Sequence, residues 1–350
     1  MRKILFLCTV ALLLLTSSCG NKMEKEAILT QDALDQADML VGRREFKKAE
    51  ELCQQTIGSL TPLIKANPNK AIFRLLRARA NITLFIANNI VVIEKTKLLP
   101  KSLVPLPSMK DYLLYDPYIV SAREDVQAVL SNKEPLSHEQ NAAAHASMGD
   151  ILRLNKDTAK EASKEYALAA LAYSDWIAEL KEKQGKTASE QFNISRLKGQ
   201  IHRIQLAEAE TDMIAEDWTA SLAVLEKIMA GSDLKYFTVQ FNLLENSLVE
   251  IERKVHRASR PKSEGGALDV KNEDVAYIPT YQAAYLQTQI ELANVKNNLI
   301  YRIICYYQLG QKDSLAEACK ILTDYYPDIE SKLMDLLDPE SQKNQTGKKK

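Results

Sequence analysis

Apolar residues recur at steps of three and four residues through most of this chain, a period that fits an α-helix with one buried face. The run of Phe46, Ala49, Leu52 and Cys53 is one example. The alternation of apolar and polar residues that marks a β-strand is hard to find. Only 11 glycines and 11 prolines interrupt 350 residues that are rich in Ala, Leu, Glu and Lys. We therefore predict an all-α fold.

Breaks in this period divide the chain into helices that are expected to pair as antiparallel hairpins. Ser137 has the spacing of a helix N-cap, with Gln140 three residues later as its capping-box partner. The predicted helices cover residues 26–41, 46–67, 70–93, 118–130, 138–154, 158–184, 188–215, 218–230, 234–259, 281–309, 313–325 and 329–337.

Three segments lack the helical pattern. Four prolines between residues 97 and 117 predict an extended apolar insert within a helical region that spans residues 26–259. Pro261 and the Gly265-Gly266 pair predict a flexible linker over residues 260–279, followed by a C-terminal hairpin and capping helix at 280–338. Residues 339–350 are polar and basic, which predicts a disordered tail.

The N-terminus has the features of an export signal. A short positive region precedes an apolar run from Ile4 to Leu15, and small polar residues then lead into Cys19. This arrangement resembles the bacterial lipoprotein signal, which implies removal of residues 1–18, lipidation of Cys19 and a tether over residues 19–25. Gly20 after the lipidated cysteine is compatible with sorting to the outer membrane. An uncleaved membrane anchor is the alternative, although the apolar run is shorter than the roughly 20 residues that a spanning helix needs.

The last hairpin has a spacing that can be compared with known repeats. Its key residues are separated by 3, 4, 5, 4, 3 and 5 positions, namely Ile303, Tyr306, Gly310, Leu315, Cys319, Leu322 and Pro327. This spacing resembles the tetratricopeptide repeat (TPR), in which small residues let paired helices approach closely. Similar copies begin at Ala37, Gly149 and Ala209. The resemblance implies an irregular TPR-like α-solenoid; a generic helical bundle is the alternative.

The resemblance also implies a binding surface, because the first helix of each TPR pair lines a concave groove. The positions that it places there are Asp38, Val41, Asp150, Arg153, Arg203, Glu210, Met213, Ile304, Tyr307 and Gln308. Mixed charge beside apolar residues suits a protein or peptide partner. We therefore expect a lipid-anchored scaffold on the periplasmic side of the outer membrane. A small-ligand-binding accessory lipoprotein of a transport system is the alternative, with residues 98–107 as its lid.

Catalytic and metal-binding patterns are weak throughout the chain. His138-Glu139 begins like a zinc-protease helix, but Ala142 occupies the position of the second histidine and no third ligand follows His145. We expect no enzyme activity, no metal and no cofactor. The 46 basic and 46 acidic residues balance, which disfavours a nucleic-acid partner. Cys305 and Cys319 are expected to be buried thiols, with a disulfide across the last hairpin as the alternative.

Overall fold

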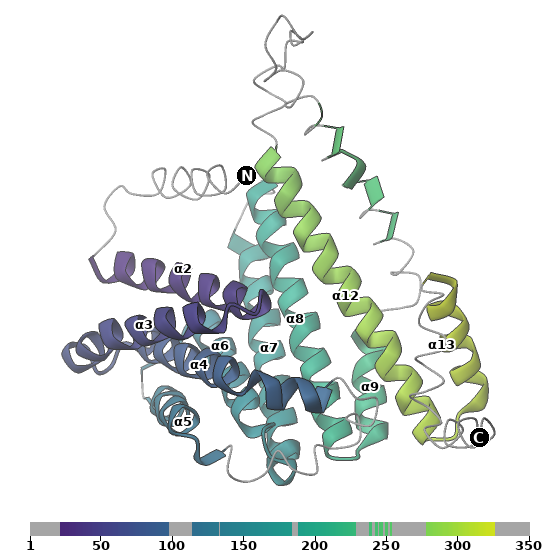
Figure 1. The fold of residues 1–350 in the computed structure, drawn as a ribbon, viewed down its shortest axis with the longest axis horizontal. Coiled ribbons are helices and arrows are strands. Elements are labelled where there is room, and N and C mark those ends of the chain that lie inside the picture. The colour runs from purple at the N-terminus through teal and green to yellow at the C-terminus, as the bar shows by residue number, and fades with distance from the viewer. Residues whose placement is uncertain are drawn as a thin grey trace, which may run out of the picture. The chain divides into compact units, whose positions relative to one another are not determined.

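The computed structural model describes residues 22–97, 114–132, 134–183, 188–228 and 278–325, with a few single helical residues between 238 and 253. Within these ranges every element is a helix and no strand occurs (Figure 1). The prediction of an all-α fold is therefore confirmed. The predicted signal, most of the Pro-rich insert, most of the linker, the helix at 329–337 and the basic tail lie outside the described residues.

The described helices fall into two units. Residues 22–228 and 298–325 belong to one compact unit, while residues 278–297, the first part of a long helix, belong to the other. The larger unit carries every side-chain arrangement analysed below. Its helices are α2 (Lys22–Gly42), α3 (Phe46–Ala66), α4 (Ala71–Lys97), α5 (Pro117–Leu130), α6 (His138–Leu152), α7 (Ala159–Lys183), α8 (Ala188–Ile214), α9 (Trp218–Ile228), the end of α12 (Ile278–Gln308) and α13 (Lys312–Tyr325).

Several helix ends differ from the predicted ones. Helix α2 begins at Lys22, inside the predicted tether, and α12 begins at Ile278, inside the predicted linker. Both ends of the predicted Pro-rich insert are helical, because Lys97 ends α4 and Pro117 begins α5. A proline is well tolerated in the first helical turn, where its missing N–H has no partner to lose. Asp116 caps that turn by accepting a hydrogen bond of 2.9 Å from the N–H of Tyr118.

The capping box predicted at the start of α6 is present. The Ser137 side chain accepts a hydrogen bond from the N–H of Gln140, and the Gln140 side chain accepts one from the N–H of Ser137, both at 3.2 Å. The two bonds satisfy donors that a helix N-terminus otherwise leaves unpaired. Between α6 and α7 the chain adds a short 3₁₀ turn, η3 (Lys156–Thr158).

Three hairpins reverse direction through the same turn. The residue that follows the first helix by two positions has a left-handed backbone in each, with φ of 61° at Arg44, 60° at Glu216 and 69° at Gly310. The next N–H donates to a carbonyl five residues earlier in each: Glu45 to Leu40 at 2.9 Å, Asp217 to Asp212 at 2.8 Å and Gln311 to Tyr306 at 2.9 Å. This is the Schellman motif, which satisfies carbonyls at the end of a helix.

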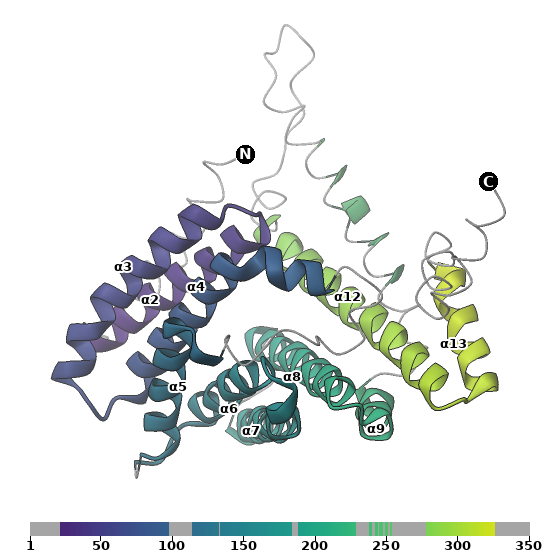
Figure 2. The same cartoon turned by 60° about the horizontal axis from the view of Figure 1, so that its bottom comes forward.

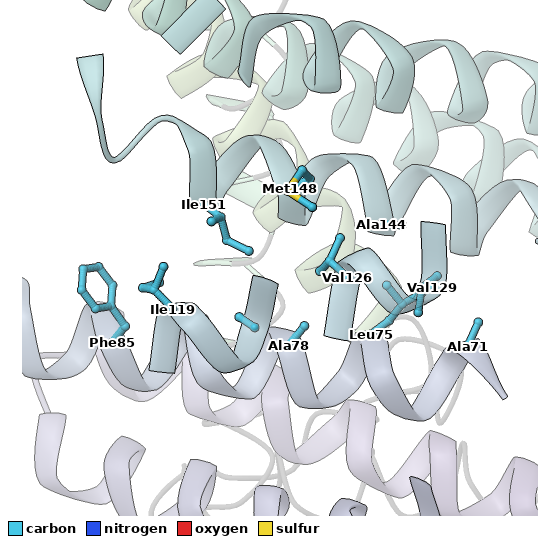
Figure 3. Close-up of a cluster of buried hydrophobic side chains, with 11 residues drawn as sticks. Ala71, Leu75, Ala78, Phe85, Ile119, Val126, Val129, Ala144, Met148 and Ile151 are labelled. Carbon is cyan, nitrogen blue, oxygen red and sulfur yellow. The ribbon is translucent and has the colours of Figure 1, made fainter. Parts of the chain in front are cut away.

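Successive helices from α2 to α9 pack against one another, and α4 also packs against α2 and α6. Helix α2 contacts both α3 and α4, while α4 contacts both α5 and α6 (Figures 1 and 2). Figure 3 shows the core where α4, α5 and α6 meet. The buried side chains of that core are Ala71, Leu75, Ala78, Phe85, Ile119, Ala122, Val126, Val129, Ala144, Met148 and Ile151. A second core joins α2, α3 and α4 through Leu34, Leu60, Ile64, Phe73, Leu76 and Ala80.

Candidate binding surface on the first helices of the pairs

The predicted surface residues lie on α2, α6, α8 and α12, the helices that begin each pair. Charged side chains link α2 to α4 and the end of α6 to α8. We call the solvent-facing polar residues of α2, α4, α6, α8 and residues 298–308 of α12 the first-helix surface. Two clusters within it, one on α2 and α4 and one on α6, α8 and α12, define its chemistry.

The first cluster holds α2 against α4. Arg79 of α4 donates to the carboxylates of Asp35, at 2.7 Å, and of Asp38. Asp38 also accepts a hydrogen bond of 2.8 Å from the Thr83 hydroxyl. The carboxylates of Asp35 and Asp38 are about half exposed, so each keeps acceptor capacity toward solvent. The cluster therefore joins two helices and still presents negative charge outward.

The second cluster centres on Arg153, the residue that caps the end of α6. Its guanidinium lies 3.5 Å from the Glu210 carboxylate of α8 and 3.6 Å from that of Asp150. The Tyr166 hydroxyl of α7 donates to Asp150 at 2.7 Å. Tyr301 of α12 lies close enough to Glu210 and Arg153 to interact with both charges. Four helices thus meet around one arginine.

Burial keeps the tyrosines of this cluster neutral. It raises the pKa of Tyr166 well above its usual value, with Arg153 opposing the shift and Asp150 adding to it. Burial likewise raises the pKa of Tyr301, and Glu210 adds to that shift. The pKa of Arg153 is raised too, since Tyr166, Asp150 and Glu210 all oppose removal of its proton. The cluster is therefore a fixed set of donors and acceptors at neutral pH, with one cation beside two carboxylates.

The structure brings some of the predicted surface residues together and separates others. Asp150, Arg153 and Glu210 share the second cluster, while Asp38 belongs to the first. Val41 is half-buried on α2, and Arg203, Tyr307 and Gln308 are exposed. Met213 and Ile304 are 2% and 5% exposed, so both pack inside the protein and neither lines a surface. The helical period groups Met213 and Ile304 with polar residues on one face of their own helices. It does not specify how closely the next helix approaches that face.

Sequence reasoning missed four residues of these clusters: Arg79, Thr83, Tyr166 and Tyr301. Arg79 and Thr83 lie on α4, a helix for which no repeat spacing was found. The Tyr166 ring packs among buried apolar side chains, whereas its hydroxyl completes the polar cluster. One signal was present: Asp150 and Arg153 are one turn apart, so a polar partner on the next helix could have been expected.

His138 and His145 of α6 each face a carboxylate of α7. His145 Nδ1 lies 2.6 Å from Glu165 on α7, and His138 Nε2 lies 3.5 Å from Glu179. Each is thus an interhelical contact of the α6–α7 pair. Among the described residues, no group of three or more His, Cys, Asp or Glu side chains could hold a metal ion.

The cysteines of the described helices are free thiols. Cys53 and Cys305 are buried, and Cys319 is half-buried. Burial raises the pKa of Cys53 to about 11, with the nearby Asp38 carboxylate adding to the shift. The disulfide considered between Cys305 and Cys319 is not formed in this structure.

None of the described helices combines the length and the apolar character required to cross a bilayer. No protein-family model matches the chain, and no curated protein or solved structure matches it significantly. The geometry of the described residues is therefore the basis for any functional conclusion.

Proposed function

We propose that this protein is a lipid-anchored, TPR-like scaffold of the bacterial cell envelope, attached to the outer membrane and facing the periplasm. Its first-helix surface binds a segment of another protein. The role is binding rather than catalysis. Each cluster on that surface carries one arginine and two carboxylates, so the surface recognises a polar, charged segment rather than a purely apolar one.

The observation that most supports the TPR-like architecture is the turn shared by three hairpins. Arg44, Glu216 and Gly310 have the same left-handed backbone and the same two hydrogen bonds around it. Each of these turns joins the two helices of one predicted pair, which is where a TPR-like hairpin requires the chain to reverse direction. The contacts of α2 with α4 and of α4 with α6 add to this support, because in a solenoid the first helices of successive pairs touch.

Lipid attachment is tested by replacing the lipidated sulfur. Cys19→Ser should move the protein from the membrane fraction to the soluble fraction of a producing bacterium, because each buried methylene of an acyl chain contributes roughly 0.8 kcal/mol to membrane binding. Cys8→Ser, in the same N-terminal region, is the matched control and should leave the protein on the membrane. Retention of the Cys19→Ser protein on the membrane would contradict lipid anchoring.

Partner binding is tested by changing the two faces of the fold separately. Arg203→Glu with Tyr307→Ser alters the first-helix surface, whereas Lys164→Glu with Leu168→Ser alters an equally exposed face of α7. Both variants are compared with the unmodified chain after crosslinking in intact envelopes. A protein captured in stoichiometric amount should be lost only from the first variant.

Two results would contradict the binding proposal. Loss of the captured protein from the α7 variant alone would place the contact elsewhere. Copurification of a small molecule, with no crosslinked protein, would favour the ligand-binding alternative.

A further inference from the structure

Two carboxylates of α8 lie where α8 packs between α7 and α9. Glu208 and Asp212 are one helical turn apart, so they share a face and repel when both are ionised. Asp212 is 6% exposed and accepts a hydrogen bond from Ser163 of α7. We call these residues, with the groups of α7, α9 and α12 that face them, the carboxylate junction.

Charged groups from each neighbouring helix face this junction. Helix α9 and its N-cap contribute Asp217 and Lys227, which interact with Asp212 and Glu208 respectively. Helix α7 contributes Lys160, whose ammonium lies 3.8 Å from Asp217. Helix α12 contributes the Cys305 thiol, which lies near Asp212. The junction therefore sets two lysines against three carboxylates, so one negative charge remains uncompensated when all are ionised.

Burial and repulsion both favour a proton on Glu208. Burial raises its pKa to about 7, with Asp212 adding to the shift and Lys227 opposing it. The pKa of Asp212 is raised as well, by burial first and then by Asp217, against the Ser163 hydrogen bond and Lys160.

Helix α9 connects the junction to the last hairpin. The Ser221 hydroxyl of α9 donates to the Ala209 carbonyl of α8 at 2.9 Å, and the Cys305 thiol of α12 donates to the Ser221 oxygen at 3.5 Å. The Asn298 amide donates to the Leu225 carbonyl at 2.9 Å. Since Ala209 follows Glu208 directly, any change in the spacing of α8 and α9 at the junction reaches α12 through Ser221.

We propose that the carboxylate junction is a proton-dependent switch in the packing of α9 between α8 and α12. A proton on Glu208 removes the repulsion with Asp212 and lets the three helices close. Loss of that proton adds a negative charge between them and loosens α9. This inference is independent of the proposed function, because it concerns the packing of helices and not a partner.

The direction of the pH dependence follows from proton linkage. The folded protein holds the Glu208 proton to higher pH than the unfolded chain does, because the pKa is raised from 4.5 to about 7. The stabilising contribution of this proton is therefore complete below pH 4.5 and is lost as the pH rises through about 7.

The fluorescence of Trp218, the first residue of α9, provides a local measurement. The chain has only one other tryptophan, Trp176. In the full-length chain carrying Trp176→Phe, tryptophan emission therefore comes from α9 alone. Trp218 emission is recorded from about pH 4.5 to 8.5, a range that brackets the pKa of about 7 that Glu208 has in the folded protein. We expect one transition near neutral pH in this background.

Four variants test whether ionisation of Glu208 causes the transition in Trp218 emission. Glu208→Gln, which is nearly isosteric, should abolish the transition, and Lys227→Met should raise its midpoint by removing a cation that favours ionisation. Glu161→Gln, at an exposed position of α7, and His202→Gln, which removes an imidazole elsewhere on α8, should leave it unchanged. Persistence of the transition in Glu208→Gln, or its absence from the unmodified chain, would overturn the proposal.

Amide hydrogen exchange gives a second measurement. Protection of residues 218–228 relative to residues 46–66 should fall as the pH rises through neutrality, since the ratio cancels the intrinsic pH dependence of exchange. A constant ratio would overturn the proposal. Glu208→Gln should hold the ratio at its low-pH value.

Discussion

Gly149 of α6 lies directly against the Tyr166 ring of α7. A β-carbon at this position would lie 2.8 Å from the Tyr166 ring, which is 1% exposed and is held by its hydroxyl bond to Asp150. The ring has little freedom to move away. We expect Gly149→Ala to lower the free energy of unfolding by about 1–3 kcal/mol, a typical cost of overpacking. Urea denaturation followed by circular dichroism measures it.

Gly58→Ala is the matched control for this substitution. Gly58 is exposed within α3, and a β-carbon there would meet nothing within 4 Å. Alanine should raise the free energy of unfolding by about 0.5–1 kcal/mol, because it restricts the unfolded chain and favours helix. If the two substitutions changed stability equally, the close contact of Gly149 with Tyr166 would be ruled out as the cause.

For single residues, the repeat spacing predicted some positions correctly and others wrongly. The repeat spacing predicted Gly149 as a small residue at a close helix approach, and the distance to Tyr166 confirms that role. It also placed Met213 and Ile304 on a surface, and both are buried. Spacing gives the direction of a side chain from its own helix. Whether a neighbouring helix covers that side chain depends on contacts distant in sequence.

At the scale of elements, Asp125 joins α4 to α5. Its carboxylate is 1% exposed and accepts two hydrogen bonds from Arg77, at 2.7 and 2.8 Å, and one from Arg74 at 3.1 Å. We expect Asp125→Asn to lower the free energy of unfolding by about 2–3 kcal/mol, because two partly buried arginines lose their counter-charge. Thermal or chemical unfolding would show it.

Asp35→Asn provides the comparison for that prediction. Asp35 also pairs with an arginine of α4, but its side chain is 56% exposed and Arg79 keeps Asp38 as a partner. The expected change is below about 1 kcal/mol, as for other exposed ion pairs. A larger loss for Asp35→Asn than for Asp125→Asn would show that burial does not set the strength of these contacts.

The turn shared by the three hairpins predicts that two substitutions change the stability of the protein in opposite directions. Gly310→Ala should destabilise the protein by about 1 kcal/mol, because a β-carbon is disfavoured in the left-handed region. Arg44→Gly, at the same position of the first hairpin, should stabilise it by up to about 1 kcal/mol for the same reason. Chemical denaturation measures both changes. If both substitutions raised, or both lowered, the free energy of unfolding, the two turns would not be equivalent.

The presence and order of the helices were easier to predict than the residues at which they begin and end. The order of the helices and the capping box at Ser137 followed from periodicity and from one local motif. The starts of α2 and α12 were placed a few residues late, at 26 and 281 rather than 22 and 278. Polar residues and a proline in a first turn resemble a loop in sequence, yet they cost a helix little there.

At the scale of the molecule, packing between neighbouring helices implies that a destabilising substitution loosens mainly the helices next to it. Asp125→Asn should increase amide exchange in residues 46–66, 71–97 and 117–130 more than in residues 188–228. In a solenoid each pair is stabilised mainly by its neighbours, whereas a single core would lose protection everywhere. Hydrogen exchange with mass spectrometry distinguishes the two, and a uniform loss would contradict the TPR-like proposal.

The burial of Cys53 has a practical consequence for labelling. With a pKa of about 11 and no exposed surface, its sulfur stays protonated at neutral pH, and protonated sulfur is a poor nucleophile. Cys305 is shielded in the same way. A cysteine introduced at exposed Gly58 would therefore react with a maleimide dye well before either of them, so of the three cysteines in the described helices only half-buried Cys319 needs replacing before site-specific labelling.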